Sequence, residues 1–139
     1  MVKAVRIVYT GVRNNIGEMN VRPLLPLLLK HDHLTVSGLG LLDTGSTVNV
    51  PPFALGLEPG LIWEQHTISV TLVGSLASSE ARGVLLDGIV EDFEPATLAF
   101  AWTRNENAPL ILGHVNFFEQ FDVCFFTSQA AFEISPRAV

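Results

Sequence analysis

The sequence has 139 residues and a net charge of −6, with 48% hydrophobic but only 16% charged residues. The acidic balance, without a basic stripe or an arginine–aromatic cluster, argues against nucleic acid as a partner. A membrane span needs about 18 or more apolar residues with few charges, and Pro26, Lys30 and Asp43 interrupt the apolar runs of this sequence.

The N-terminal part of the chain predicts strands. Residues 2–10 alternate charged and β-branched side chains, without the continuous apolar core of a signal peptide. The polar stretch 11–18 predicts a turn, and 21–30 is rich in leucine. Pro23 and Pro26 make a long helix there unfavourable and confine a strand to an edge or a bulge.

The polar residues His31, Asp32 and His33 follow. They resemble a fragment of a metal site, but neighbouring residues on a strand point to opposite faces, and no matching cluster occurs elsewhere. We therefore interpret them as a hairpin turn and expect no metal.

The next predicted strand covers 34–42 and ends at Asp43. A carboxylate at the end of a buried strand is unfavourable unless hydrogen bonds or a special ionisation state compensate. Thr44 and Ser46 supply hydroxyl groups, and Gly45 lets the backbone turn with its amides exposed. These are features of an activated acid, although Asp-x-Gly also occurs in ordinary turns.

The middle of the chain predicts an extended segment over 47–50, a short helical turn over 53–57 and a core position for Trp63. Residues 66–73 alternate, 74–79 are small, and 82–90 are apolar again. This pattern predicts a long hairpin with a mobile tip.

The C-terminal part begins with a strand over 97–102 and a short apolar strand over 110–113 that ends in glycine. Three phenylalanines at 117, 118 and 121 predict a short helix, with Asn116 as its N-cap, before closing strands over 123–126 and 131–134. Cys124 is the only cysteine, which excludes an internal disulfide. We interpret it as a packing residue and expect a reducing compartment, the cytoplasm.

Two motifs, in this order, resemble those of retropepsin-like aspartic proteases: Leu41-Leu42-Asp43-Thr44-Gly45-Ser46 and Leu110-Ile111-Leu112-Gly113. The resemblance covers roughly residues 22–134. Arg22-Pro23-Leu24-Leu25 is similar to viral members, whereas 111–123 is more similar to bacterial ones. The chain therefore resembles a bacterial-type member with one domain over 1–139. The resemblance implies an all-β fold, a small closed acid-protease barrel with one short C-terminal helix and one half-site per chain.

The resemblance also implies an activity. An aspartic endopeptidase needs two carboxylates that share a proton: one activates a water molecule and the other polarises the scissile carbonyl. The chain carries one Asp-Thr-Gly triplet, so the pair requires a homodimer with Asp43 from each chain. The low share of charged residues agrees with a dimer, with an apolar groove, or with both.

Residue roles follow from the same resemblance. Asp43, Thr44 and Gly45 would be catalytic, and Thr44 would contact the same loop of the partner chain. The hairpin between the two motifs would be a flap that closes over a peptide or protein substrate, although its pattern alone fits an ordinary hairpin equally well. The expected substrate-binding residues are Ser46, Thr47, Gly74, Ser75, Leu76, Ile111 and Leu112. No cofactor is expected, and the terminal strands would interleave in the dimer.

The sequence departs from the viral pattern at two places. Viral members often carry an acid four residues after the catalytic aspartate and an arginine after the later glycine, where this chain has Thr47 and His114. The interchain ion network is therefore expected to be absent or rebuilt, with His114 as a structural hydrogen-bonding group. An apolar groove under the 66–90 hairpin would favour extended peptides with hydrophobic side chains. The alternatives are a dimeric module that binds peptides without cutting them and a β-domain that only drives assembly.

Overall fold

The computed structural model describes residues 4–138. Its strands are β1 (Val5–Val8), β2 (Thr10–Arg13), β3 (Met19–Arg22), β4 (Leu24–His31), β5 (Leu34–Leu42), β6 (Ala81–Ile89), β7 (Ala96–Thr103), β8 (Ile111–Leu112), β9 (Phe121–Phe126) and β10 (Ala131–Pro136). The helical segments are α1 (Phe53–Leu57), α2 (Phe117–Gln120) and the 3-10 turns η1 (Trp63–Gln65), η2 (Gly74–Leu76) and η3 (Thr127–Gln129). The all-β class is confirmed, and the helical turn expected at 53–57 is α1.

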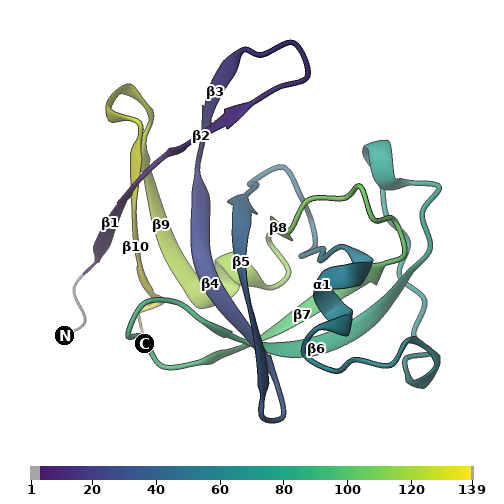
Figure 1. Ribbon diagram of the computed structural model, residues 1–139. Coiled ribbons are helices and arrows are strands. Elements are labelled where there is room, and N and C mark those ends of the chain that lie inside the picture. The colour runs from purple at the N-terminus through teal and green to yellow at the C-terminus, as the bar shows by residue number, and fades with distance from the viewer. Residues whose placement is uncertain (1–3, 139) are drawn as a thin grey trace.

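The strands form three sheets (Figure 1). The largest has the order β7-β6-β4-β5-β8 and is antiparallel except for the parallel pair β5–β8. A second antiparallel sheet has the order β1-β10-β9, and β2 and β3 form a hairpin that projects from the top of the molecule in Figure 1. Because β10 lies between β1 and β9 of its own chain, interleaving with a partner could use only the outer edges of this sheet.

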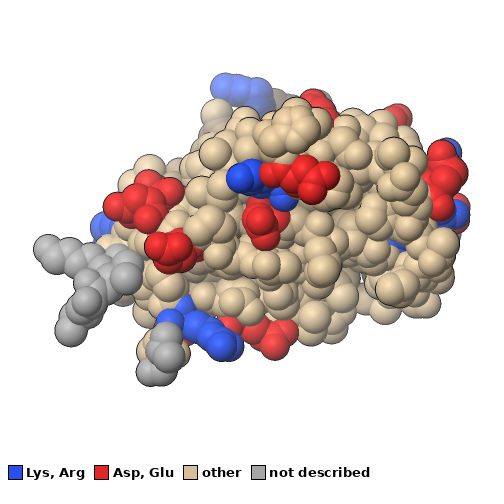
Figure 2. Space-filling view, turned by 90° about the horizontal axis from the view of Figure 1, so that it is seen from below, with Lys and Arg blue, Asp and Glu red and all other residues tan. Residues whose placement is uncertain are grey.

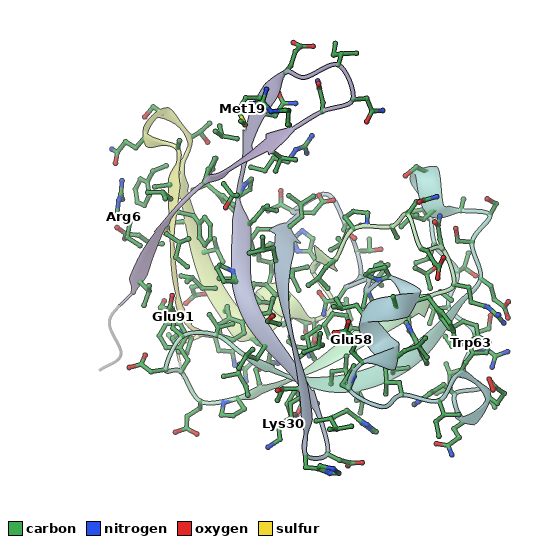
Figure 3. The ribbon with its side chains drawn as sticks, in the orientation of Figure 1. Arg6, Met19, Lys30, Glu58, Trp63 and Glu91 are labelled. Atoms are coloured by element: carbon green, nitrogen blue, oxygen red, sulfur yellow. The ribbon has the colours of Figure 1, made fainter. Side chains whose placement is uncertain are left out.

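The pairing of β4 with β5 sets the position of the later site. The register runs from Leu24 opposite Leu41 to His31 opposite Leu34, so the expected hairpin turn at 31–33 is confirmed. Strand β6 pairs with β4 only at residues 28–30, which leaves Pro26 in a part of β4 with a strand on one side only. Strand β5 then runs from the end of the molecule that Lys30 marks toward the end that Met19 marks (Figure 3).

Side chains of the large sheet form most of the core, together with residues of η1, α2 and β10, and it includes the expected inward residues of β7 and Trp63. Its fully or nearly fully buried members include Leu25, Leu29, Leu42, Leu86, Leu98, Phe100, Trp102, Leu112, Phe117 and Phe132. Phe53 of α1 stacks on Trp102 with ring centroids 5.2 Å apart, and the Trp102 indole N–H donates to the Phe53 carbonyl. The helix α1 is thereby fixed against one face of the sheet.

Several local predictions were wrong. The strand β2 extends to Arg13, because the turn starts only at Asn14, whose Oδ1 accepts the backbone N–H groups of Ile16 and Glu18. Residues 66–73 form no regular strand: one isolated bridge joins Ser69 to Arg82. The predicted hairpin therefore has only one regular strand, β6.

Two side-chain predictions were also wrong. Asn116 precedes α2 but makes no capping hydrogen bond, because its side chain binds the backbone of β7 instead. Cys124 is exposed: it pairs with Glu133 of β10, between the buried residues Phe132 and Ile134. Within residues 4–138, no helix is long and apolar enough to cross a membrane.

Candidate active site

Asp43 directly follows β5, at the end of its short parallel pairing with β8. Leu42 pairs with Leu112, and the Asp43 backbone N–H donates to the Leu112 carbonyl at 3.0 Å. Leu42 and Leu112 are buried, so Asp43 lies where the end of β5 leaves the core, and its side chain is half-buried. The sequence therefore places a carboxylate at the boundary between the core and solvent.

The Asp43 loop is held by its own hydrogen bonds. The Gly45 N–H donates to Asp43 Oδ1 at 2.9 Å, and the Ser46 N–H donates to the Asp43 carbonyl at 3.1 Å. The Ser46 hydroxyl donates to the Val48 carbonyl at 2.7 Å, so the loop continues into the extended segment 47–50. The carboxylate thus accepts one backbone N–H and keeps its second oxygen for other partners.

The loop crosses the segment that follows β8. The His114 N–H donates to Ser46 O at 3.0 Å, and the Val115 N–H donates to Thr47 O at 2.9 Å. At the crossing point a Cβ on Gly113 would lie 2.5 Å from Val48 O and 2.7 Å from Ser46 O, which are backbone atoms. Only glycine fits there, which explains why the second motif ends in this residue.

A buried amide network that the sequence analysis missed fixes the crossing. Asn49 has no exposed surface; its Oδ1 accepts the Gly113 N–H at 2.7 Å, and its Nδ2 donates to Ala99 O at 2.9 Å. The Asn116 side chain accepts the Ala99 N–H and donates to Thr97 O. The sequence does contain a signal for this network, an asparagine between two valines in an apolar segment. A buried side-chain amide at such a position needs hydrogen-bond partners.

The residue after Gly113 also holds the loop. His114 Nε2 lies 2.6 Å from the carbonyl oxygen of Thr44, and the ring packs against Phe118 with centroids 5.4 Å apart. The expected role of His114 as a hydrogen-bonding group is therefore confirmed. Thr44 itself is exposed, at the outer side of the loop.

A cavity of about 230 Å³ opens beside Asp43. The segment 71–76, which includes η2, forms its opposite wall, and Ile111 also contributes. Of the ten residues predicted for the site, the cavity brings together Asp43, Gly45, Ser46, Thr47, Gly74, Ser75, Leu76 and Ile111. It does not include Thr44 or Leu112, whose side chain is fully buried against Gly40 and can contribute only its backbone.

A larger apolar groove of about 760 Å³ lies next to this cavity, and both are lined by Val48. Its other residues come from 66–70, β6 and β7, with His31 and Val115 at the margin. Ile68 and Leu85 expose 71% and 64% of their surface, so the groove offers apolar side chains to solvent. A third hollow of about 700 Å³ on β4 and β5 does not include Asp43 or any other residue predicted for the site.

Figure 2 shows the face of the molecule at the other end of β5, where acidic and basic residues are scattered among uncharged ones. Within residues 4–138, no three His, Cys, Asp or Glu side chains are placed to hold a metal ion.

Comparison with solved structures identifies the architecture. A retropepsin-like aspartic protease from Rickettsia conorii matches with a TM-score of 0.61 over 96% of this chain and 96% of that chain, at 14% sequence identity. The EIAV protease in complex with the inhibitor HBY-793 matches with a TM-score of 0.50 over 78% of this chain and 92% of that chain, at 16% identity. The chain has a retropepsin-like fold.

In this chain, the parallel pairing of β5 with β8 and the crossing at Gly113 bring the two motifs, far apart in sequence, together at Asp43. Identities this low show the fold alone. No protein-family model matches the sequence, and no curated protein sequence is significantly similar to it.

Proposed function

We propose that this chain is an aspartic endopeptidase that acts as a homodimer. The observation that carries the proposal is the position of Asp43. It lies in an Asp-Thr-Gly loop that crosses the Leu110–Gly113 segment in a retropepsin-like fold, with its carboxylate facing a cavity. An ordinary Asx turn would explain the Gly45 hydrogen bond, but it would not require the buried Asn49 network or the obligatory glycine behind the loop.

The chemistry requires two carboxylates, and each chain supplies one Asp-Thr-Gly triplet. In the proposed dimer, Asp43 of each chain lies at the two-fold axis, with Thr44 directed at the partner's loop. Two carboxylates in contact share one proton. The ionised one takes a proton from water, the neutral one gives its proton to the scissile carbonyl oxygen, and the resulting hydroxide attacks the carbonyl carbon. The tetrahedral intermediate then collapses: its C–N bond breaks, the leaving amine takes the proton that the first carboxylate received from water, and a hydroxyl group of the intermediate returns a proton to the second carboxylate. Water is the only co-reactant.

Apolar surface supports dimerisation. Ile16, Met19 and Val21 on the projecting β2–β3 hairpin expose 79%, 57% and 56% of their surface, and Val73 near η2 exposes 73%. Only 16% of the residues are charged, so the chain has little charged surface to surround these exposed apolar side chains. Burial against a second copy would remove them from water.

The segment 66–90 is proposed as the flap. Its regular arm is β6, and the other arm is joined to it by the Gly83 N–H to Ile68 O bond of 2.8 Å and the Val70 N–H to Ala81 O bond of 3.0 Å. The tip around η2 is held by two turn bonds, from the Ala77 N–H to Gly74 O and from the Ser79 N–H to Leu76 O, and it lines the same cavity as Asp43. An arm with so few ladder bonds is suited to local opening.

The groove suggests the substrate. An extended peptide would place one side chain in the cavity beside Asp43, and Val48 would lead it into the groove lined by Ile68, Val70 and Leu85. We propose a preference for hydrophobic side chains, with the edge of the 66–73 segment supplying backbone hydrogen bonds. The exposed single thiol of Cys124 suits a reducing compartment such as the cytoplasm.

The test is cleavage of an unbiased peptide library from about pH 4 to about pH 7 by the wild type and by Asp43→Asn. Asp92→Asn, at an exposed turn far along the sequence, is the matched control. Cuts made by wild type and Asp92→Asn but not by Asp43→Asn support the proposal, and the cut sites report the preference. A dimeric protein that binds library peptides without cutting any would instead be a peptide-binding module.

A further inference from the structure

His114 and Asp43 contact two ends of one peptide group. The carbonyl oxygen of Thr44 lies 2.6 Å from His114 Nε2, and the N–H of the same peptide group, on Gly45, donates to Asp43 Oδ1 at 2.9 Å. The peptide group is planar and rigid, so its orientation about the loop sets both contacts at once. His114 therefore touches the carboxylate indirectly, through one amide.

The geometry fixes the protonation of the ring. A carbonyl oxygen only accepts hydrogen bonds, so Nε2 must carry a proton at this distance. Within residues 4–138, no Asp, Glu, Lys or Arg side chain forms an ion pair with His114, and the ring packs against Phe118 of α2. Asp43 is thus the titratable group that the ring reaches through the loop.

We propose that His114 is a positioning residue for Asp43, acting through the peptide group that joins Thr44 to Gly45. This inference rests on the proposed aspartic protease function. The imidazole N–H holds the Thr44 carbonyl, and this keeps the Gly45 N–H directed at the carboxylate. Loss of this donor would let the peptide group rotate and would weaken the Gly45 hydrogen bond, so that the ionised carboxylate is less stabilised.

The position of His114 makes it suitable for this role. Its own backbone N–H donates to Ser46 O, so both its main chain and its side chain hold the Asp43 loop, on either side of Gly45. Its ring packs against Phe118 on one side, and the residue is exposed on the other.

The test compares His114→Phe and His114→Gln with the wild type, by kcat and KM for one cleaved peptide from about pH 3.5 to about pH 7. Phenylalanine keeps the packing on Phe118 but removes the donor. We expect kcat to fall by about three- to tenfold with KM nearly unchanged, as for the loss of one hydrogen bond, and the low-pH limb of kcat/KM to move to higher pH. Glutamine restores a donor, so kcat should recover and the low-pH limb should return toward its wild-type position.

His33→Phe and His33→Gln are the matched controls, because His33 is exposed at the turn between β4 and β5, at the opposite end of β5 from Asp43. Superimposable profiles of wild type and both His114 variants would overturn the inference and leave the proposed function intact. It is also overturned if high enzyme concentration restores kcat and the wild-type profile in His114→Phe, since the residue would then act on dimerisation. A wild type that cuts no peptide refutes the proposed function itself.

Discussion

The backbone N–H of Gly113 donates a hydrogen bond of 2.7 Å to the side-chain oxygen of Asn49, which is fully buried. These residues are far apart in sequence, and their contact joins the segment after the Asp43 loop to the end of β8. The same amide donates to Ala99 O of β7. One asparagine therefore ties three segments together directly behind Asp43.

The first prediction concerns this amide. Asn49→Leu has a similar volume but leaves the Gly113 N–H and the Ala99 carbonyl without their partner in a buried place. Each unpaired group costs about 1–3 kcal/mol, so we expect the free energy of unfolding to fall by about 3 kcal/mol. Urea unfolding measures this value. Asn107→Leu, at an exposed loop position, should change it by less than about 0.5 kcal/mol; equal effects of the two substitutions would contradict the structural role.

The second prediction concerns the crossing. Gly113→Ala places a Cβ within 2.7 Å of two backbone carbonyl oxygens, Ser46 O and Val48 O, which cannot rotate away. The segments must separate, so we expect a loss of about 2 kcal/mol or more in stability and loss of proteolysis. Thermal unfolding and peptide cleavage report the two effects.

Gly83→Ala is the control for this change. A Cβ there meets its nearest neighbours at 3.7 Å, an ordinary contact, and the residue lies within β6. A glycine within a strand is unfavourable relative to alanine by about 0.5–1 kcal/mol, so the control should fold at least as stably as the wild type. If Gly113→Ala were as stable as Gly83→Ala, this result would contradict the close approach of residue 113 to the backbone of 46–48.

The elements that sequence analysis predicted well are those with a complete local pattern. Leu98, Phe100 and Trp102 alternate along β7 and are all buried, and the strand that ends at Asp43 is β5. A period-two pattern states which face is buried without reference to any other part of the chain. The hydroxyl and glycine residues after β5 could therefore be recognised as a loop at the edge of the core.

The elements that it missed depend on distant partners. Ile68, Val70 and Leu72 alternate as a strand would, but the edge of β6 that they face is also used by β4 at 87–89, and 66–73 meets β6 only around Ser69 and Arg82. Asn116 was predicted as a helix cap, yet its side chain hydrogen-bonds to the backbone of β7. The partners are Ala99 and Thr97, which lie 17 and 19 residues away in sequence. Such choices between competing partners are made by tertiary packing, which a local pattern does not contain.

The third prediction concerns substrate preference. Ile68→Asp puts a carboxylate into the apolar groove at a position that is 71% exposed, so the fold should tolerate it. We expect KM for peptides with hydrophobic side chains to rise by about tenfold or more, because one apolar contact is replaced by a charge. Ile62→Asp makes the same change at a 48% exposed site between α1 and η1, outside the groove and away from the β2–β3 hairpin, and should leave KM unchanged. A similar KM in both variants would mean that substrate does not enter the groove.

The fourth prediction concerns pH and stability at the margin of the groove. The pKa of His66 lies below its ordinary value of 6.5, because burial disfavours the charged ring and the positive charges of His31 and Arg82 add to this effect. The ring packs edge-on against Trp102, with centroids 6.0 Å apart. Around and below pH 6.5 the unfolded chain therefore binds more protons at this residue than the folded chain does. The contribution of His66 to stability is present in full above that pH and is lost as the pH falls.

Urea unfolding of the wild type and of His66→Phe, at about pH 5 and about pH 7.5, measures the effect. Phenylalanine keeps an aromatic ring against Trp102 but cannot be protonated, so the variant should gain stability relative to the wild type at the lower pH and not at the higher one. Carboxylates add their own pH dependence to both proteins, and the difference between the two proteins removes it. His33→Phe, at the exposed β4–β5 turn, should follow the wild type at both values. If the difference between the wild type and His66→Phe were the same at both pH values, protonation of His66 would not oppose folding.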